Sequence, residues 1–228
     1  MKLSNKILIG IFAFIFIYMT VAFTEIRLKG DKNGRNFSDA QVESIDIENI
    51  AFLVIPDVNR HVNVSSSKDP RIEVRSVSGD LLSRLKYKIS GDTLELQEFD
   101  SKEEPAIINI YGPSHMLRGL LINGAGVTVY GLDQNELSIT QYAGTVRFED
   151  DNKLKRLNLE AFNEADVNAR GFELEELSIQ ADRSYINFWL PVSRLSGSIA
   201  NESRLTIQSP YDIQFKKDES SRLQIVNR

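Results

Sequence analysis

A repeat of about 20 residues in the second half of the chain limits the fold most strongly. Two series of apolar–polar–apolar triplets interleave there, and a looser apolar series follows them. The first series begins at Leu120, Leu137, Leu157, Leu177 and Leu195, and the second begins at Val127, Val146, Val167, Ile186 and Leu205. Alternation with a period of two is typical of β-strands. A strand pattern that returns every 20 or so residues is typical of a β-solenoid.

The repeat also explains why one coil needs its neighbours. Only alternate side chains of a strand face inward, so a single coil cannot bury its own apolar row. Corners between strands need small or turn-forming residues. Four segments supply them: Asn123-Gly124-Ala125-Gly126, Ala143-Gly144, Asn163-Glu164-Ala165 and Asn201-Glu202-Ser203. We therefore expect an all-β fold in which residues 120–228 form a single-stranded right-handed β-solenoid, or β-helix.

Residues 44–119 show the same strand alternation without the regular spacing. Runs such as 61–65 and 93–97 are separated by turn residues, for example Ser90-Gly91-Asp92. We expect a strand-rich head that caps the solenoid, because an open end exposes an unpaired strand edge. A β-sandwich is the alternative fold, since regular turns in this part suit it. The steady spacing after residue 120 favours the solenoid.

The N-terminal region is apolar and uncharged over 17 residues, 7–23. As a helix this stretch spans about 25 Å, enough for a thin hydrocarbon core. Lys2 and Lys6 precede it, which predicts that residues 1–6 stay in the cytoplasm and that the bulk is exported. Residues 7–28 are thus predicted to form a transmembrane helix or signal anchor, and residues 29–43 a linker. A cleaved signal peptide is the alternative. Either predicts a domain in the periplasm or on the cell surface.

Composition excludes several function classes. Of the 27 basic and 32 acidic residues, residues 31–228 hold 23 and 31, so this part is a poor binder of nucleic acid. The chain has no cysteine, which excludes disulfides, thiolate nucleophiles and Cys-ligated zinc. His61 and His115 lack metal-ligand spacing, so neither metal nor cofactor is expected. The acidic turn Glu149-Asp150-Asp151-Asn152 lacks the spacing of a calcium loop and is expected to be solvated.

Four stretches carry a resemblance to a known family. They are the N-terminal apolar segment, VESIDIENIAFLVIPDVNRHVNVS leading to ISGDTLELQ, the run INIYGPSHMLRGLLINGAGVTVYG, and the LSI and LNL repeats. Together they resemble the bacterial head GIN domain family of proposed auto-transporter adhesins, over about residues 42–210. The resemblance implies an exported, envelope-associated β-solenoid with a proposed adhesive role, and it supplies no catalytic residues. The retained anchor and the fewer glycines in the later coils depart from that family.

Aligning the second triplet series predicts which side chains face outward together. Neighbours in a row of stacked coils lie about 4.8 Å apart. Arg170 is placed between Glu149 and Trp189, where it can pair with the carboxylate and stack on the ring. Tyr130, Arg170, Tyr185 and Trp189 therefore form a candidate surface for a ligand or partner. In the alternative interpretation, Trp189 packs on Arg170 or lies beneath a loop.

These features favour a membrane-anchored, non-catalytic interaction module that binds an envelope glycan or protein. A scaffold assembled by coil-to-coil stacking is the first alternative, and the oligomeric state stays open. A polysaccharide-cleaving enzyme is less favoured, because such catalysis needs carboxylates gathered on one strand face. The available cluster of Glu149, Asp166 and Arg170 places its two acids in different rows.

Overall fold

The structure is a computed structural model. It describes residues 15–16, 18–20, 40–48, 50–101, 104–113, 115–149, 151–208 and 210–227. The chain divides into two compact units, Met1–Ala40 and Gln41–Arg228. In the first unit the described residues are helical, and most of the predicted anchor (7–28) and linker (29–43) lies outside the described residues. Within the described ranges, no helix has the length and apolar character to span a membrane.

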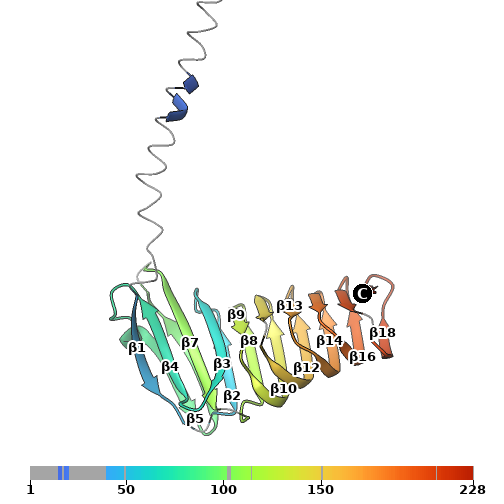
Figure 1. Cartoon of the computed structure of the whole chain (residues 1–228), viewed down its shortest axis with the longest axis horizontal. Coiled ribbons are helices and arrows are strands. Elements are labelled where there is room, and N and C mark those ends of the chain that lie inside the picture. The colour runs from blue at the N-terminus through green and yellow to red at the C-terminus, as the bar shows by residue number, and fades with distance from the viewer. Residues whose placement is uncertain are drawn as a thin grey trace, which may run out of the picture. The chain divides into compact units, whose positions relative to one another are not determined.

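The unit Gln41–Arg228 is built of β-strands in two sheets, as predicted (Figure 1). The strands are β1 (Gln41–Asp46), β2 (Phe52–Pro56), β3 (His61–Ser67), β4 (Arg71–Ser76), β5 (Leu85–Ser90), β6 (Thr93–Phe99), β7 (Ala106–Pro113), β8 (Gly119–Asn123), β9 (Gly126–Val129), β10 (Asp133–Tyr142), β11 (Thr145–Phe148), β12 (Lys153–Phe162), β13 (Asp166–Arg170), β14 (Leu174–Asp182), β15 (Tyr185–Trp189), β16 (Val192–Ala200), β17 (Arg204–Gln208), β18 (Asp212–Lys217) and β19 (Arg222–Val226). A single 3₁₀ turn, Leu82–Arg84, precedes β5. One sheet has ten strands and the other has nine.

From β8 onward, each coil contributes one strand to each sheet. The even-numbered strands β8 to β18 belong to the nine-stranded sheet, and the odd-numbered strands β9 to β19 belong to the ten-stranded sheet. Each strand pairs in parallel with the strand two places further along the chain, at an offset of 18 to 21 residues. The β-solenoid is therefore confirmed, and the β-sandwich alternative is wrong.

The third apolar series lies at the beginning of the long strands of the nine-stranded sheet. Leu154 of β12 and Leu174 of β14 are buried. Two residues that are not buried follow each of them, and the alternation resumes at Leu157 and Leu177. A coil thus has two strands, the first with a break in its alternation, rather than three separate strands.

The segment 44–119 contributes coils of its own to the stack. Strands β2 and β3 pair in parallel with β8 and β9 on one side, and with β6 and β7 on the other. The remaining strands pair antiparallel: β4 with β7, β1 with β4, and β5 with β6. The coil stack therefore extends ahead of residue 120, and the antiparallel strands β1, β4 and β5 cover that end.

Inward side chains form apolar ladders across the coils, because the parallel pairing is in register. In the nine-stranded sheet one ladder runs through Leu53, Leu120, Ile139, Leu159 and Ile179. In the ten-stranded sheet another runs through Val62, Val127, Val146, Val167, Ile186 and Leu205. All of these side chains are buried, so the two sheets share one continuous core.

Left-handed backbone closes the corners where the sequence placed turn residues. Ala143 and Gly144 have φ of 58° and 74°, Asn163 and Glu164 have 58° and 66°, and Asn201 and Glu202 have 54° and 66°. Glycine and asparagine tolerate this region better than other residues do. The four predicted corners are confirmed, since Gly124 also has a positive φ of 75°.

Candidate functional site

The outward side chains of the ten-stranded sheet lie in straight rows. Asp166 of β13 pairs with Thr145 on one side and with Tyr185 on the other, and Tyr185 pairs with Arg204. In the neighbouring row, Asn168 pairs with Arg147 and Asn187. The predicted row alignment is therefore confirmed. Whether these rows bind a ligand stays a prediction, and their geometry is considered next.

One row, which we call the aromatic row, crosses most of the ten-stranded sheet. Arg71 of β4 pairs with Tyr111 of β7, and Tyr111 pairs with Ser65 of β3. Arg170 of β13 pairs with Trp189 of β15. The aromatic row consists of Arg71, Tyr111, Ser65, Tyr130, Glu149, Arg170 and Trp189. The parallel coils and the head strands thus present one continuous line of rings and charges.

The centre of the aromatic row contains the predicted ion pair. The Arg170 Nη2 atom lies 2.6 Å from Oε2 of Glu149, and its Nε atom lies 3.1 Å from the same oxygen. Trp189 follows on the next strand and is 51% exposed, so it is not covered by a loop of the described chain. A shallow cavity of about 360 Å³ lies here, lined in part by Arg147, Glu149, Arg170 and Trp189.

The head end of the aromatic row was missed by the sequence analysis. The Arg71 guanidinium lies 4.2 Å from the centroid of the Tyr111 ring and donates a hydrogen bond of 2.6 Å to Glu73. Burial raises the pKa of Tyr111 to about 12, and its hydrogen bond with Tyr130 acts in the same direction. Tyr111 is therefore a neutral phenol at neutral pH, tied to the predicted site residue Tyr130.

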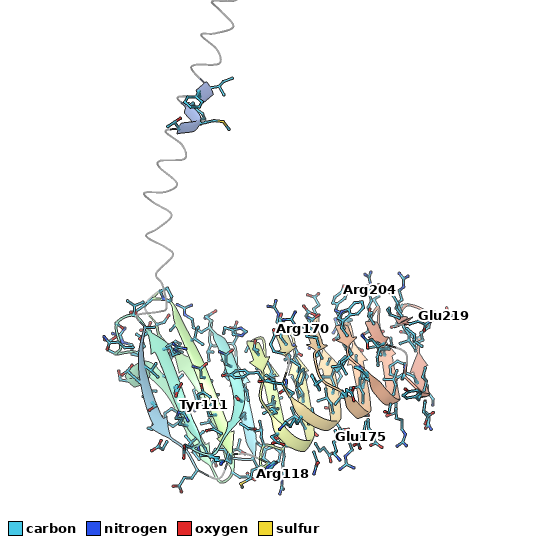
Figure 2. All side chains as sticks on the ribbon, viewed as in Figure 1. Tyr111, Arg118, Arg170, Glu175, Arg204 and Glu219 are labelled. Atoms are coloured by element: carbon cyan, nitrogen blue, oxygen red, sulfur yellow. The ribbon has the colours of Figure 1, made fainter. Side chains whose placement is uncertain are left out.

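The other end of the sheet carries a second aromatic side chain with two arginines. Tyr185 is 47% exposed, and the Arg204 guanidinium lies 5.8 Å from its ring centroid. Arg222 of β19 pairs with Arg204. A cavity of about 300 Å³ lies among them, lined also by Asn187 and Thr206. Figure 2 shows Arg170 and Arg204 on the same side of the strand stack, with Glu175 on the opposite side.

Neutral amides separate these charged positions. The Asn187 Nδ2 atom donates to Oδ1 of Asn168 at 3.2 Å, and the Asn168 Nδ2 atom donates to Oδ1 of Asp166 at 2.8 Å. Further along the same row, Asn63 donates to Asn109 at 2.8 Å. Among the described residues, no group of three histidine, cysteine or acidic side chains is placed to hold a metal ion.

The nine-stranded sheet differs, because its exposed charges neutralise one another. Glu136 accepts from Arg156 at 3.1 Å, and Arg194 is paired with both Glu176 and Asp212. These five residues alternate in sign along one row. The row therefore reads as a surface ion-pair ladder, and each of its pairs contributes at most about 1 kcal/mol.

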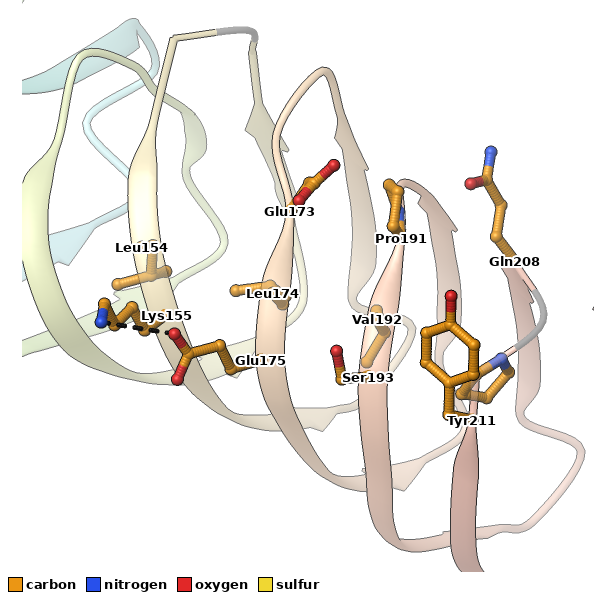
Figure 3. Close-up of a pocket in the computed structure, with 11 residues that line it drawn as sticks. Leu154, Lys155, Glu173, Leu174, Glu175, Pro191, Val192, Ser193, Gln208 and Tyr211 are labelled. Carbon is orange, nitrogen blue, oxygen red and sulfur yellow. Dashed lines mark ion pairs between the residues drawn. The ribbon is translucent and has the colours of Figure 1, made fainter.

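A larger cavity, of about 590 Å³, lies near the start of the long strands of the nine-stranded sheet (Figure 3). Its charged lining includes Lys155 and Glu175, which form an ion pair of 3.3 Å. Tyr211 borders it and is 95% exposed. Because its lysine is already paired, this cavity offers a weaker case for a charged ligand than the ten-stranded face does.

Comparison with known proteins identifies a class of fold rather than a named protein. No protein-family model matches the sequence, and no curated protein matches it. Among solved structures, the chain is similar to a proposed adhesin from Bacteroides fragilis, with a TM-score of 0.54 and 12% identity over 83% of this chain and 98% of that one. A proposed adhesin from Parabacteroides distasonis gives 0.55 and 13%, over 83% and 94%. At these identities the likeness shows the fold alone.

Proposed function

We propose that this chain is a non-catalytic binding module of the bacterial envelope, and that the outer face of its ten-stranded sheet holds an envelope glycan or protein. The observation that carries the proposal is the exposure of Trp189 and Tyr185 on one rigid strand. They lie two residues apart, a spacing of about 7 Å along the strand. Exposed aromatic side chains on a flat polar face are typical of recognition surfaces.

The setting of these rings supports binding rather than packing. Strands fix both side chains, so little conformational entropy is lost when a ligand binds. The flanking amides Asn168 and Asn187 offer hydrogen bonds to sugar hydroxyls or to a peptide. The likeness to proposed adhesins agrees with this role.

The proposal includes an anchor and an export route. Residues 7–28 form the transmembrane helix or signal anchor, and Gln41–Arg228 lies in the periplasm or on the cell surface. The uncharged stretch 7–23 and the preceding Lys2 and Lys6 support this topology. Protease treatment of intact cells and of spheroplasts tests it. Digestion of the domain only after both membranes are opened would contradict an exported domain.

Catalysis is disfavoured by the state of the acidic residues on this face. Glu149 is held in an ion pair by Arg170, and Asp166 accepts a hydrogen bond from Asn168. A glycosidase needs one carboxyl group to deliver a proton and a second to act as base or nucleophile. Release of soluble fragments from envelope polysaccharide would contradict the non-catalytic assignment.

The binding experiment compares two exposed aromatic residues. The full-length chain in mild detergent is incubated with isolated envelope material, and bound protein is measured by co-sedimentation. We expect Trp189→Ala to weaken binding about tenfold or more, as truncation of an aromatic hot spot does. Tyr211→Ala, at the cavity of Figure 3, is the matched control and is expected to bind like the wild type. The opposite pattern would move the site to that cavity and overturn the proposal.

Self-assembly is a second candidate function, favoured by the open end of the stack. Strands β18 and β19 are the last in their sheets, and Ile213 and Ile225 are exposed there. Lys216 and Lys217 on β18 oppose edge-to-edge pairing, because charged edge residues disfavour added strands. Mass measurement of the detergent-solubilised chain separates the two functions. A stable monomer contradicts the scaffold.

A further inference from the structure

The arginines of the two sheets differ in their partners. On the nine-stranded sheet, Arg156 and Arg194 are paired with carboxylates. On the ten-stranded sheet, Arg204 and Arg222 lie opposite each other on β17 and β19. Neither of them forms an ion pair with any residue in the described part of the chain. Two exposed cations therefore lie side by side without a counter-charge.

This arrangement has an electrostatic cost that an anion removes. Paired residues on neighbouring strands are about 5 Å apart, and like charges directly opposite repel each other. A guanidinium remains charged at any physiological pH, so deprotonation cannot relieve the repulsion. The corner carboxylates Glu202 and Glu219 form no ion pair with either arginine among the described residues. A bound anion would bridge both.

The cavity between the two arginines fits a sugar that carries the anion. Its lining holds no carboxylate and includes Tyr185, Asn187, Thr206 and Gln224 besides the two arginines. The half-exposed Tyr185 ring offers a flat apolar surface, while the amides and the hydroxyl offer hydrogen bonds to sugar hydroxyls. Arginine is suited to a carboxylate, because its planar fork donates two parallel hydrogen bonds.

We propose that Tyr185, Arg204 and Arg222 form a subsite for the carboxylate of an acidic polysaccharide. The inference rests on the proposed binding function and names its ligand class. A nucleic acid does not fit, because residues 31–228 carry an excess of acidic side chains and lack a long basic stripe. The adjacent Trp189 and Asn168 extend the same face, so neighbouring sugar units follow the sheet.

The test uses a polymer whose charge can be removed without changing its sugar backbone. Binding of the full-length chain to polygalacturonate is compared with binding to its methyl ester, at low and at physiological salt. We expect binding to the acid and at least about tenfold weaker binding to the ester. Dextran sulfate is the third probe. Equal or tighter binding to it would show a general anion site and overturn the choice of carboxylate.

The variants separate local recognition from overall charge. The double change Arg204→Gln and Arg222→Gln is expected to weaken polygalacturonate binding about tenfold or more. The change of Arg156 and Arg194 to Gln alters the net charge equally on the other sheet and is expected to leave binding unchanged. Equal loss in both double variants, or no loss in the first, overturns the subsite. Circular dichroism checks that each variant keeps its β-structure.

Envelope binding distinguishes failure of the subsite from failure of the proposed function. If Trp189→Ala loses envelope binding while the Arg204 and Arg222 double variant keeps it, the proposed function stands and the subsite falls. If neither change reduces envelope binding, both fall. Loss in both, together with selective loss of polygalacturonate binding in the arginine variant, supports both.

Discussion

Asn152 gives the sharpest test of how the corners hold the coils together. The residue is only 4% exposed, and its side chain makes three hydrogen bonds to backbone. Its Oδ1 atom accepts from the Leu132 amide at 3.1 Å. Its Nδ2 group donates to the Val129 carbonyl at 3.2 Å and to the Glu149 carbonyl at 2.7 Å. One amide therefore joins its own corner to the corner of the preceding coil.

The cost of removing this amide follows from what each partner has left. In Asn152→Ala the buried Leu132 N–H loses its acceptor, which costs about 1–3 kcal/mol. The Val129 carbonyl still accepts from the Glu149 amide at 3.1 Å, so its loss is small. The Glu149 carbonyl is only partly buried, and its lost bond costs about 1 kcal/mol. We expect a total loss of about 2–4 kcal/mol in the free energy of unfolding.

The measurement is thermal unfolding of the full-length chain in mild detergent, followed by circular dichroism. A loss of 2–4 kcal/mol lowers the Tm by about 5–15 °C in a domain of this size. Asn158→Ala is the control, because Asn158 donates to Glu136 on the outer face at 3.0 Å. It is expected to change stability by no more than about 0.5 kcal/mol. A change no larger in Asn152→Ala would refute the corner argument.

Two further predictions concern the later coils. Gly197 has a φ of +116°, and a Cβ there would lie 1.9 Å from a carbonyl oxygen of β14, so Gly197→Ala is expected to cost more than about 2 kcal/mol in the same assay. Gly91→Ala is the control, since Gly91 has a positive φ but open space around it, and equal losses would contradict the contact. Hydrogen bonds from Ser221 and from the Asn201 backbone lower the pKa of Asp218 from 3.8 to about 2. The carboxylate therefore stabilises the fold above pH 4 and loses this effect as the pH falls through 2, so the Tm difference between wild type and Asp218→Asn should close over that range. A difference that stays constant from pH 6 to pH 2 would argue against it.

Local spacing predicted the later coils well, because parallel pairing at a fixed offset follows from a repeat. The register that joins Glu149, Arg170 and Trp189 is a consequence of that offset alone. The place of Tyr111 in the same row is different. It depends on β7 pairing with β3 after the chain has formed β4, β5 and β6, and no sequence period records that return. The alternation in 106–111 marked a strand there but gave no partner.

The acidic turn shows how composition misled the prediction. Glu149-Asp150-Asp151-Asn152 was expected to be a solvated loop, yet Asn152 is buried and Asp151 accepts from the Gly131 amide at 2.8 Å. Three neighbouring acids dominate the local composition, whereas the corner geometry selects one amide that both donates and accepts. A corner recurs once per coil, so the position of Asn152 relative to the repeat was the signal available.

The contrast between the two sheets bears on function more than any single contact does. The row through Glu136, Arg156 and Arg194 shows that this chain can place opposite charges next to each other on stacked strands. On the ten-stranded sheet the same geometry places Arg204 beside Arg222. Surface ion pairs are worth little, so stability alone selects weakly between these arrangements. Departures from local complementarity are expected where a ligand completes the surface. The unpaired arginines and the half-exposed Tyr185 and Trp189 lie on the same face, so one acidic glycan can account for both.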